Sequence, residues 1–171
     1  MATEEVLRAP HVLEYAYTRS VGPVIGRFFT GLRDGKIEGI KGARGQVIVP
    51  PVEYDPQTAE SLSEFVEVGQ SGVVTTWAWV NEPRPNNPLQ RPFAWALIKL
   101  DGADTSMLHV VDAGSEANMK TGMRVRVRWR AERDGRIQDI ECFEAATEGS
   151  PRGTAARGAA QPEDVERSST K

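Results

Sequence analysis

The sequence has only one cysteine, Cys142, among its 171 residues. A single thiol cannot form an internal disulfide, so nothing in the chain implies an oxidising compartment. Its apolar runs are also short, and the stretch 93–98 is far below the roughly 20 residues that a membrane-spanning helix needs. No signal-peptide pattern is seen at the N-terminus. We therefore expect a cytoplasmic protein.

A strong charge of either sign is absent as well, because 24 acidic residues nearly balance 21 basic ones and the net charge is −3. This balance argues against nonspecific binding of nucleic acid. The chain has no nucleophile elbow, no glycine-rich phosphate loop and no cluster with metal-ligand spacing. Of its two histidines, His109 lies in a predicted strand, where a structural role is more common than general-base chemistry. We expect no cofactor and no catalysis by this chain alone.

One helix is predicted, over residues 20–34, after a mixed polar arm at residues 1–17. Ser20 can cap this helix, Pro23 suits its first turn, and Gly35 suits a left-handed stop. Apolar residues recur at helical spacing along the amphipathic segment 18–35, namely Val21, Ile25, Phe28, Phe29 and Leu32. This face either packs on its own domain or meets another subunit. Phe28 and Phe29 are therefore candidates for binding a partner.

The rest of the ordered chain is predicted to be mainly β. Strands are expected at residues 36–40, 46–49, 64–68, 72–82, 93–101, 106–112, 123–132 and 136–144. Several short strands separated by turn residues are typical of a small barrel, which we place at residues 62–145. Beyond it, residues 146–171 consist largely of small and charged residues, so we expect a disordered tail.

The dipeptide Asp134-Gly135 predicts a two-residue hairpin turn near the end of the barrel. That turn would pair Trp129 with Ile140, and Val127 with the core residue Cys142. On the opposite face it would pair Arg130 with Asp139 and Arg128 with Glu141. The same face carries Arg124 and Arg126, which this register leaves without carboxylate partners. These two arginines are our candidates for binding an anion.

Aromatic residues make up only 7% of the chain but gather in two predicted strands. Trp77 and Trp79 are two residues apart and share a face, as do Phe93 and Trp95 in the next strand. Exposed aromatic side chains on a barrel can stack on bases. Because lysines are few, we favour a core or a subunit interface, and we take Trp77, Trp79 and Trp95 as candidates for binding a partner.

The segment 36–61 has the spacing of a short zinc ribbon without its ligands. Zinc in a structural site needs about four nitrogen or sulfur ligands. The places where cysteines would stand are occupied by Lys41, Arg44, Asp55 and Thr58. We therefore predict a degenerate, metal-free knuckle. As a hypothesis, Lys41 or Arg44 pairs with Asp55 and holds the knuckle together electrostatically.

With a helix, a ribbon frame and a barrel in this order, the chain resembles the DUF35 family. The resemblance covers residues 18–145 and is carried by segments 28–36, 45–51, 66–74, 92–101 and 121–127. It implies an OB-fold behind an N-terminal helix and a rubredoxin-like zinc ribbon, here without the zinc cysteines. It further implies a non-catalytic accessory subunit in a hetero-oligomer with a thiolase-like, lipid-transfer-protein-type enzyme. The substrates of such enzymes are acyl-CoA or steroid side-chain CoA thioesters, so a CoA thioester at the interface is also expected.

Two other functions are kept open. The chain could bind single-stranded nucleic acid as other OB-folds do, using Arg124, Arg126 and Trp79, although this rests on analogy between folds. It could also bind acyl-CoA without any partner protein, with Arg124 and Arg126 contacting the CoA phosphates.

Overall fold

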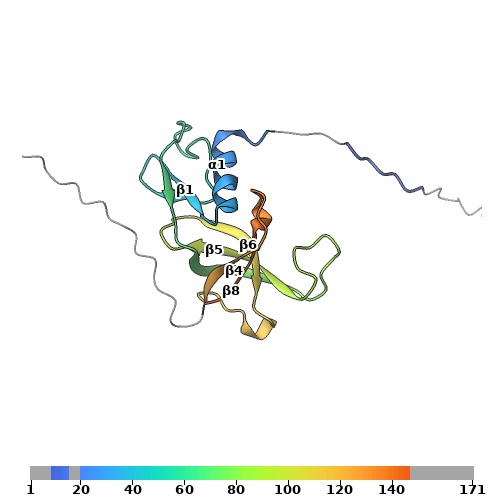
Figure 1. Cartoon of the computed structure of the whole chain (residues 1–171). Helices are drawn as coiled ribbons and strands as arrows, with labels where there is room; N and C mark the ends of the chain where they lie inside the picture. Colours follow the sequence, from blue (N-terminus) through green and yellow to red (C-terminus); the bar gives the residue numbers. More distant parts are fainter. Residues whose placement is uncertain (1–8, 16–19, 147–171) are drawn as a thin grey trace, which may run out of the picture.

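The computed structural model describes residues 9–15 and 20–146 (Figure 1). Most of the predicted arm and nearly all of the predicted tail lie outside these residues. Residues 9–15 have no regular secondary structure, and their side chains are exposed. Across the described ranges, no helix is long and apolar enough to cross a membrane.

Helix α1 spans Gly22–Arg33, close to the predicted bounds. The Ser20 hydroxyl accepts a hydrogen bond from the Gly22 amide at 3.3 Å, and Pro23 lies in the first turn. The helix ends where Gly35 adopts a φ of 74°, the left-handed conformation that glycine tolerates. Its buried face includes Phe28 and Leu32. The predicted amphipathic helix is therefore present.

A three-stranded antiparallel sheet follows α1 in the order β2-β1-β3. Its strands are β1 (Glu38–Lys41), β2 (Val47–Ile48) and β3 (Phe65–Glu67). Ile40 and Ile48 pair across it and pack with Val24 of α1 in a small apolar cluster. The sheet thus holds the knuckle segment against the N-terminal half of the helix.

The remaining strands form a closed barrel in the order β4-β5-β6-β8-β7. They are β4 (Ser71–Val80), β5 (Phe93–Leu100), β6 (Ser106–Asp112), β7 (Arg124–Trp129) and β8 (Ile140–Ala145). A short 3-10 turn, η1 (Glu116–Asn118), precedes β7. All pairings are antiparallel except β6 with β8, which pair in parallel at only two positions. The predicted mainly β fold with an OB-like barrel is confirmed.

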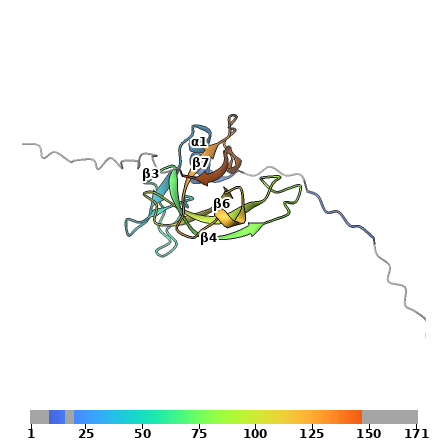
Figure 2. The same cartoon turned by 90° about the horizontal axis from the view of Figure 1, so that it is seen from below.

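The main core joins the barrel interior to α1. Phe28 and Leu32 of the helix belong to the same buried cluster as Ile98 of β5 and Phe143 of β8. In Figures 1 and 2, α1 lies across one side of the barrel, next to the connection between β7 and β8. Arg133 in that connection donates to the carbonyl of Arg33 at 2.9 Å. Helix and barrel are therefore one packed unit.

The predicted two-residue turn at Asp134-Gly135 is wrong, because the connection is longer and includes a 3-10 turn, η2 (Ile137–Asp139). The Asp139 carboxylate causes this shape by accepting hydrogen bonds from the amides of residues 134, 135 and 136 at 2.8–3.1 Å. This carboxylate therefore does not pair with the Arg130 side chain, although the predicted hairpin register required that pair. The Arg130 amide instead donates to the Asp139 carbonyl at 2.9 Å.

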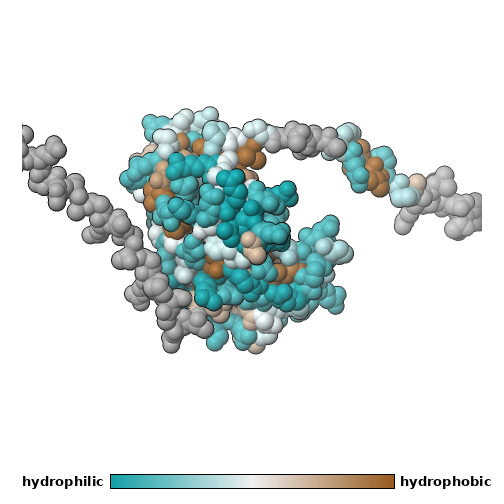
Figure 3. All heavy atoms as spheres, viewed as in Figure 1, coloured by the Kyte–Doolittle hydropathy of each residue, from teal (hydrophilic) through white to brown (hydrophobic). Residues whose placement is uncertain are grey.

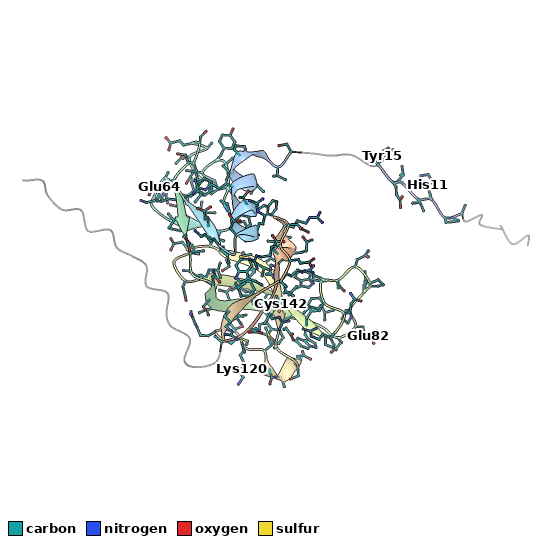
Figure 4. All side chains as sticks on the ribbon, viewed as in Figure 1. His11, Tyr15, Glu64, Glu82, Lys120 and Cys142 are labelled. Atoms are coloured by element: carbon teal, nitrogen blue, oxygen red, sulfur yellow. The ribbon has the colours of Figure 1, made fainter. Side chains whose placement is uncertain are left out.

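A β-bulge at Glu141 changes the register beyond that turn. Trp129 pairs with Ile140 as predicted, but Val127 pairs with Phe143 rather than with Cys142. The extra residue places Cys142 opposite Arg128. Cys142 is fully buried, as predicted, but it shares the face of Arg128 and packs with Phe93 and Val110 outside the main core cluster. Burial raises the pKa of its thiol to about 12. In Figure 4 it lies among the barrel strands.

Candidate functional site

The aromatic candidates occupy different environments. Phe28 is 1% exposed, so its ring is part of the core and offers no surface to a partner. For this residue the structure supports packing on its own domain. Phe29 is half-buried, with its ring centroid 5.8 Å from that of Phe28. Of the two, only Phe29 could reach another subunit.

The three tryptophan candidates do not form one surface. Trp77 pairs with Ala96, whereas Trp95 pairs with Ala78, so the two indoles lie on opposite faces of β4 and β5. Trp77 and Trp79 pack against the main core, and the Trp79 Nε1 donates to Asn81 at 2.9 Å. Trp95 packs in a second cluster. That cluster contains Val80, Leu89, Phe93, Val110 and Cys142.

Arg124 and Arg126, which the predicted register left unpaired, both have carboxylate partners. Arg124 makes a two-pronged contact with Asp101 at 2.7 and 2.6 Å. Arg126 pairs with Glu144 at 2.7 Å. The first partner lies beyond the end of β5 and the second becomes available through the bulge, so hairpin reasoning could not find either. The stripe of arginines on β7 is largely neutralised.

Arg128 lies at the centre of a charge network on the outer face of the barrel. It contacts Glu141 at 3.1 Å, as predicted, and also Asp112 and Glu144 at 3.2 Å. Arg91 pairs with the same Asp112 from the connection between β4 and β5. Burial raises the pKa of Asp112, but hydrogen bonds from Arg91 and Arg128 outweigh this effect, and the net shift is downward. Asp112 is therefore ionised at neutral pH.

We predict that Arg128→Met lowers the free energy of unfolding at pH 7 by about 1–3 kcal/mol, because three carboxylates lose a shared partner in a partly buried site. The loss should shrink as the pH falls through the lowered pKa of Asp112, since a protonated carboxyl no longer needs a cation. Urea unfolding at pH 7 and pH 3 measures both values. Arg44→Met, at an exposed position, is the matched control. An equal loss at both pH values would contradict the electrostatic explanation.

The Asp55 carboxylate organises the knuckle. Its Oδ1 accepts hydrogen bonds from the amides of Gln57 and Thr58 at 2.8 and 3.0 Å, within its own turn. Its Oδ2 crosses to the other turn and accepts from the Ala43 amide at 2.9 Å and from Gln46 Nε2 at 3.2 Å. The amide of Ala43 is the main cause of a lowered pKa for this buried carboxyl, followed by that of Gln57.

This arrangement corrects the hypothesis that Lys41 or Arg44 pairs with Asp55. Lys41 pairs with Glu64 at 2.9 Å instead, and the Arg44 side chain is exposed. Thr58 contributes its amide to Asp55, while its hydroxyl contacts Glu60 at 3.3 Å. Throughout the described ranges, no three His, Cys, Asp or Glu side chains are grouped as metal ligands. Descent of the knuckle from a zinc ribbon stays a prediction.

Gly42 allows the two turns of the knuckle to approach each other. A Cβ at this position would lie 2.3 Å from Gln46 Nε2 and 2.8 Å from Asp55 Oδ2. A side chain at this position would therefore displace the Gln46 amide and crowd the Asp55 carboxylate.

A pocket of about 150 Å³ was not predicted from the sequence. It lies on the outside of β5 and β6, between the connection before β5 and the connection after β7. Its apolar walls come from Pro88, Trp95, Leu108, Val110, Ile137 and Ile140, and its polar groups from His109, Arg130, Gln138 and Glu141. These residues are scattered over 54 positions of the chain and form no local motif, so only the fold brings them together.

His109 lines this pocket and is 6% exposed. Its Nε2 lies 3.4 Å from the carbonyl of Ile137, and its Nδ1 has no hydrogen-bond partner within the described part of the chain. Burial lowers the pKa of the imidazole, so the ring is neutral at pH 7. His109 is buried, as the predicted structural role requires, but one of its two ring nitrogens has no hydrogen-bond partner within the described residues.

Comparisons with known proteins agree with this fold. Residues 65–130 match the family model described as ChsH2, C-terminal OB-fold domain. A DUF35-family protein of unknown function from Sulfolobus solfataricus has a similar structure, with 25% identity, a TM-score of 0.51, and coverage of 62% of this chain and 78% of the other. A chain of the Ltp2-ChsH2(DUF35) aldolase is 17% identical, with a TM-score of 0.57 and coverage of 76% and 100%. No curated protein matches the chain.

The family match begins at β3 and ends just after β7, so it includes four of the five barrel strands. Residues 65–130 are therefore similar to the C-terminal OB-fold domain of ChsH2, and the predicted resemblance of the chain to DUF35 proteins is confirmed.

Proposed function

We propose that this chain is a non-catalytic accessory subunit that binds and supports a thiolase-like enzyme. The observation that carries the proposal is the match of residues 65–130 to the ChsH2 C-terminal OB-fold domain. A structure described as the Ltp2-ChsH2(DUF35) aldolase supports it, because the whole length of one of its chains aligns with this one. By this reading the two proteins form a hetero-oligomer.

We further propose that the partner enzyme acts on CoA thioesters, of acyl groups or of steroid side chains, as the resemblance to DUF35 proteins implies. The geometry restricts how this chain could contact the CoA. Arg124 and Arg126 would have to exchange Asp101 and Glu144 for phosphate groups. Such an exchange at an exposed pair is inexpensive, since surface ion pairs contribute only about 0–1 kcal/mol.

The residues that suggested binding of single-stranded nucleic acid do not support it in the structure. The arginines on β7 that suggested it are paired with carboxylates. Trp77 and Trp79 pack against the core instead of forming an open stacking platform.

The experiment is to purify the tagged chain from its native cells and identify co-purifying proteins by mass spectrometry. We expect a thiolase-like enzyme in near-stoichiometric amount. That enzyme should then be purified with and without this chain and assayed for cleavage of a CoA thioester. The proposal predicts that turnover or thermal stability of the enzyme rises when the chain is added. An enzyme that neither binds the purified chain nor responds to it would contradict the proposal.

A further inference from the structure

The outer face of β5 and β6 is apolar where it is open to solvent. Leu97 and Leu108 are directly paired across the two strands and are 37% and 59% exposed. Trp95 lies on the same face two residues before Leu97 and is half-buried. We call Trp95, Leu97 and Leu108 the outer patch. Figure 3 shows that the surface is largely hydrophilic, with separate hydrophobic areas, one of them beside the connection between β4 and β5.

The outer patch continues into the pocket, because Trp95 and Leu108 also form pocket walls. A volume of about 150 Å³ is that of a cavity known to accept a benzene ring, so one aromatic or branched aliphatic side chain fits. The pocket also occupies the place at which other OB-folds bind oligonucleotides and oligosaccharides, so its position marks a binding face without identifying the occupant. It lies over the second and third barrel strands, beside the connections that follow the first and fourth.

The rim of the pocket carries one uncompensated positive charge. Arg130 is exposed and has no ion pair within residues 20–146. Glu141, which also lines the pocket, is engaged by Arg128 at 3.1 Å. The three carboxylates of that network, Asp112, Glu141 and Glu144, are matched by Arg91, Arg126 and Arg128. Asp139, which follows Gln138, directs its carboxylate to three backbone amides. The charge left at the rim is that of Arg130.

We propose that the outer patch and its pocket receive a segment of the partner enzyme that places one aromatic or branched aliphatic side chain in the pocket and an acidic side chain beside Arg130. This inference rests on the proposed function and adds the surface through which the chain would bind the partner enzyme. The apolar walls provide the anchor, and the unpaired guanidinium selects a carboxylate next to it. A second copy of this chain is the competing occupant.

The test measures binding of the purified thiolase-like enzyme to the full chain by titration calorimetry. Leu108→Asp should weaken binding at least about 30-fold, as expected at a hot spot. Arg130→Glu should weaken it about tenfold and make the remaining binding less sensitive to salt. Both side chains are exposed, so circular dichroism and Tm should stay at the wild-type values.

Tyr54→Asp is the matched control for the leucine, since Tyr54 is also 59% exposed but lies in the knuckle. Arg44→Glu is the control for the arginine.

The outcomes separate the two proposals. If the wild-type chain binds the enzyme and both pocket variants bind equally well, the docking surface is overturned and the accessory function stands. If the wild-type chain does not bind the enzyme, both proposals fail. Light scattering on the chain alone addresses the competing occupant, because a dimer that Leu108→Asp abolishes would assign the outer patch to a second copy and overturn the inference.

Discussion

Replacing Phe28 by alanine should lower the free energy of unfolding by about 3–5 kcal/mol, the usual cost of removing a buried phenyl ring from a core. The ring is 1% exposed and lies in the cluster that joins α1 to the barrel. A cavity there removes contacts of both α1 and the barrel, so residues 20–146 should unfold together at a lower urea concentration. Val21→Ala, at the half-exposed position directly before the same helix, should change stability by less than about 0.5 kcal/mol.

The same variant tests whether Phe28 of α1 contacts the partner enzyme or only packs on the barrel. If Phe28 were a partner contact, its loss would weaken the complex and leave stability unchanged. We expect the opposite: Phe28→Ala binds the enzyme normally at temperatures where it is folded, and binding falls only in step with the folded fraction. Reduced binding by a fully folded variant would return Phe28 to the interface. Phe29→Ala should be examined separately, because that ring is only half-buried.

Replacing Asp55 by alanine should open the knuckle, since one carboxylate accepts four hydrogen bonds that tie its two turns together. Four donors would be left without their acceptor. We expect the Tm to fall by several degrees and proteolysis of residues 42–60 to begin before the barrel is cut. Thr58→Ala is the matched control, because the amide of that residue and not its hydroxyl binds Asp55. Unchanged proteolysis in Asp55→Ala would show that the turns hold without the carboxylate.

The knuckle should also be sensitive to acid. The pKa of Asp55 is lower in the folded chain than its ordinary value of about 3.9, so the folded state binds its proton less readily than the unfolded state. The resulting stability is fully present above about pH 5 and is lost as the pH falls through the folded pKa. Asp55→Asn removes the charge at every pH, so it should be less stable than wild type at pH 7. The difference should shrink by pH 3, and a constant difference would contradict the linkage.

The sequence patterns predicted the regular parts of this fold well because those parts depend on local spacing. The apolar repeat at helical spacing located α1, and alternation located the barrel strands. Side-chain pairing was predicted less well because each of two strands has a bulge. The irregularity beside Thr75 shifts the pairing of β4 with β5 by one residue, and the one at Glu141 moves every later residue of β8 by one position.

The partners of the charged side chains were harder to predict than the positions of the strands. Asp139 looks like a cross-strand partner for Arg130, but its carboxylate folds back on three amides of its own connection. Asp55 was considered as a partner for a cation and instead binds backbone amides. In both cases a short acidic side chain satisfies nearby N–H groups before it reaches a distant charge. Pro56 directly after Asp55 is a sequence signal for such a turn, whereas Asp139, between Gln138 and Ile140, has no neighbouring glycine or proline to indicate it.

The parallel pairing between β6 and β8 is the shortest in the barrel. Only Val111 with Phe143 and Asp112 with Glu144 pair along it, whereas the β5–β6 pairing extends over six residues. Arg128 contacts a carboxylate from each of these two strands and so fastens the junction from outside. This short pairing is therefore reinforced by ion pairs, which salt screens. At high salt, amide hydrogens beside this junction should exchange with solvent first, while those between β4 and β5 remain protected.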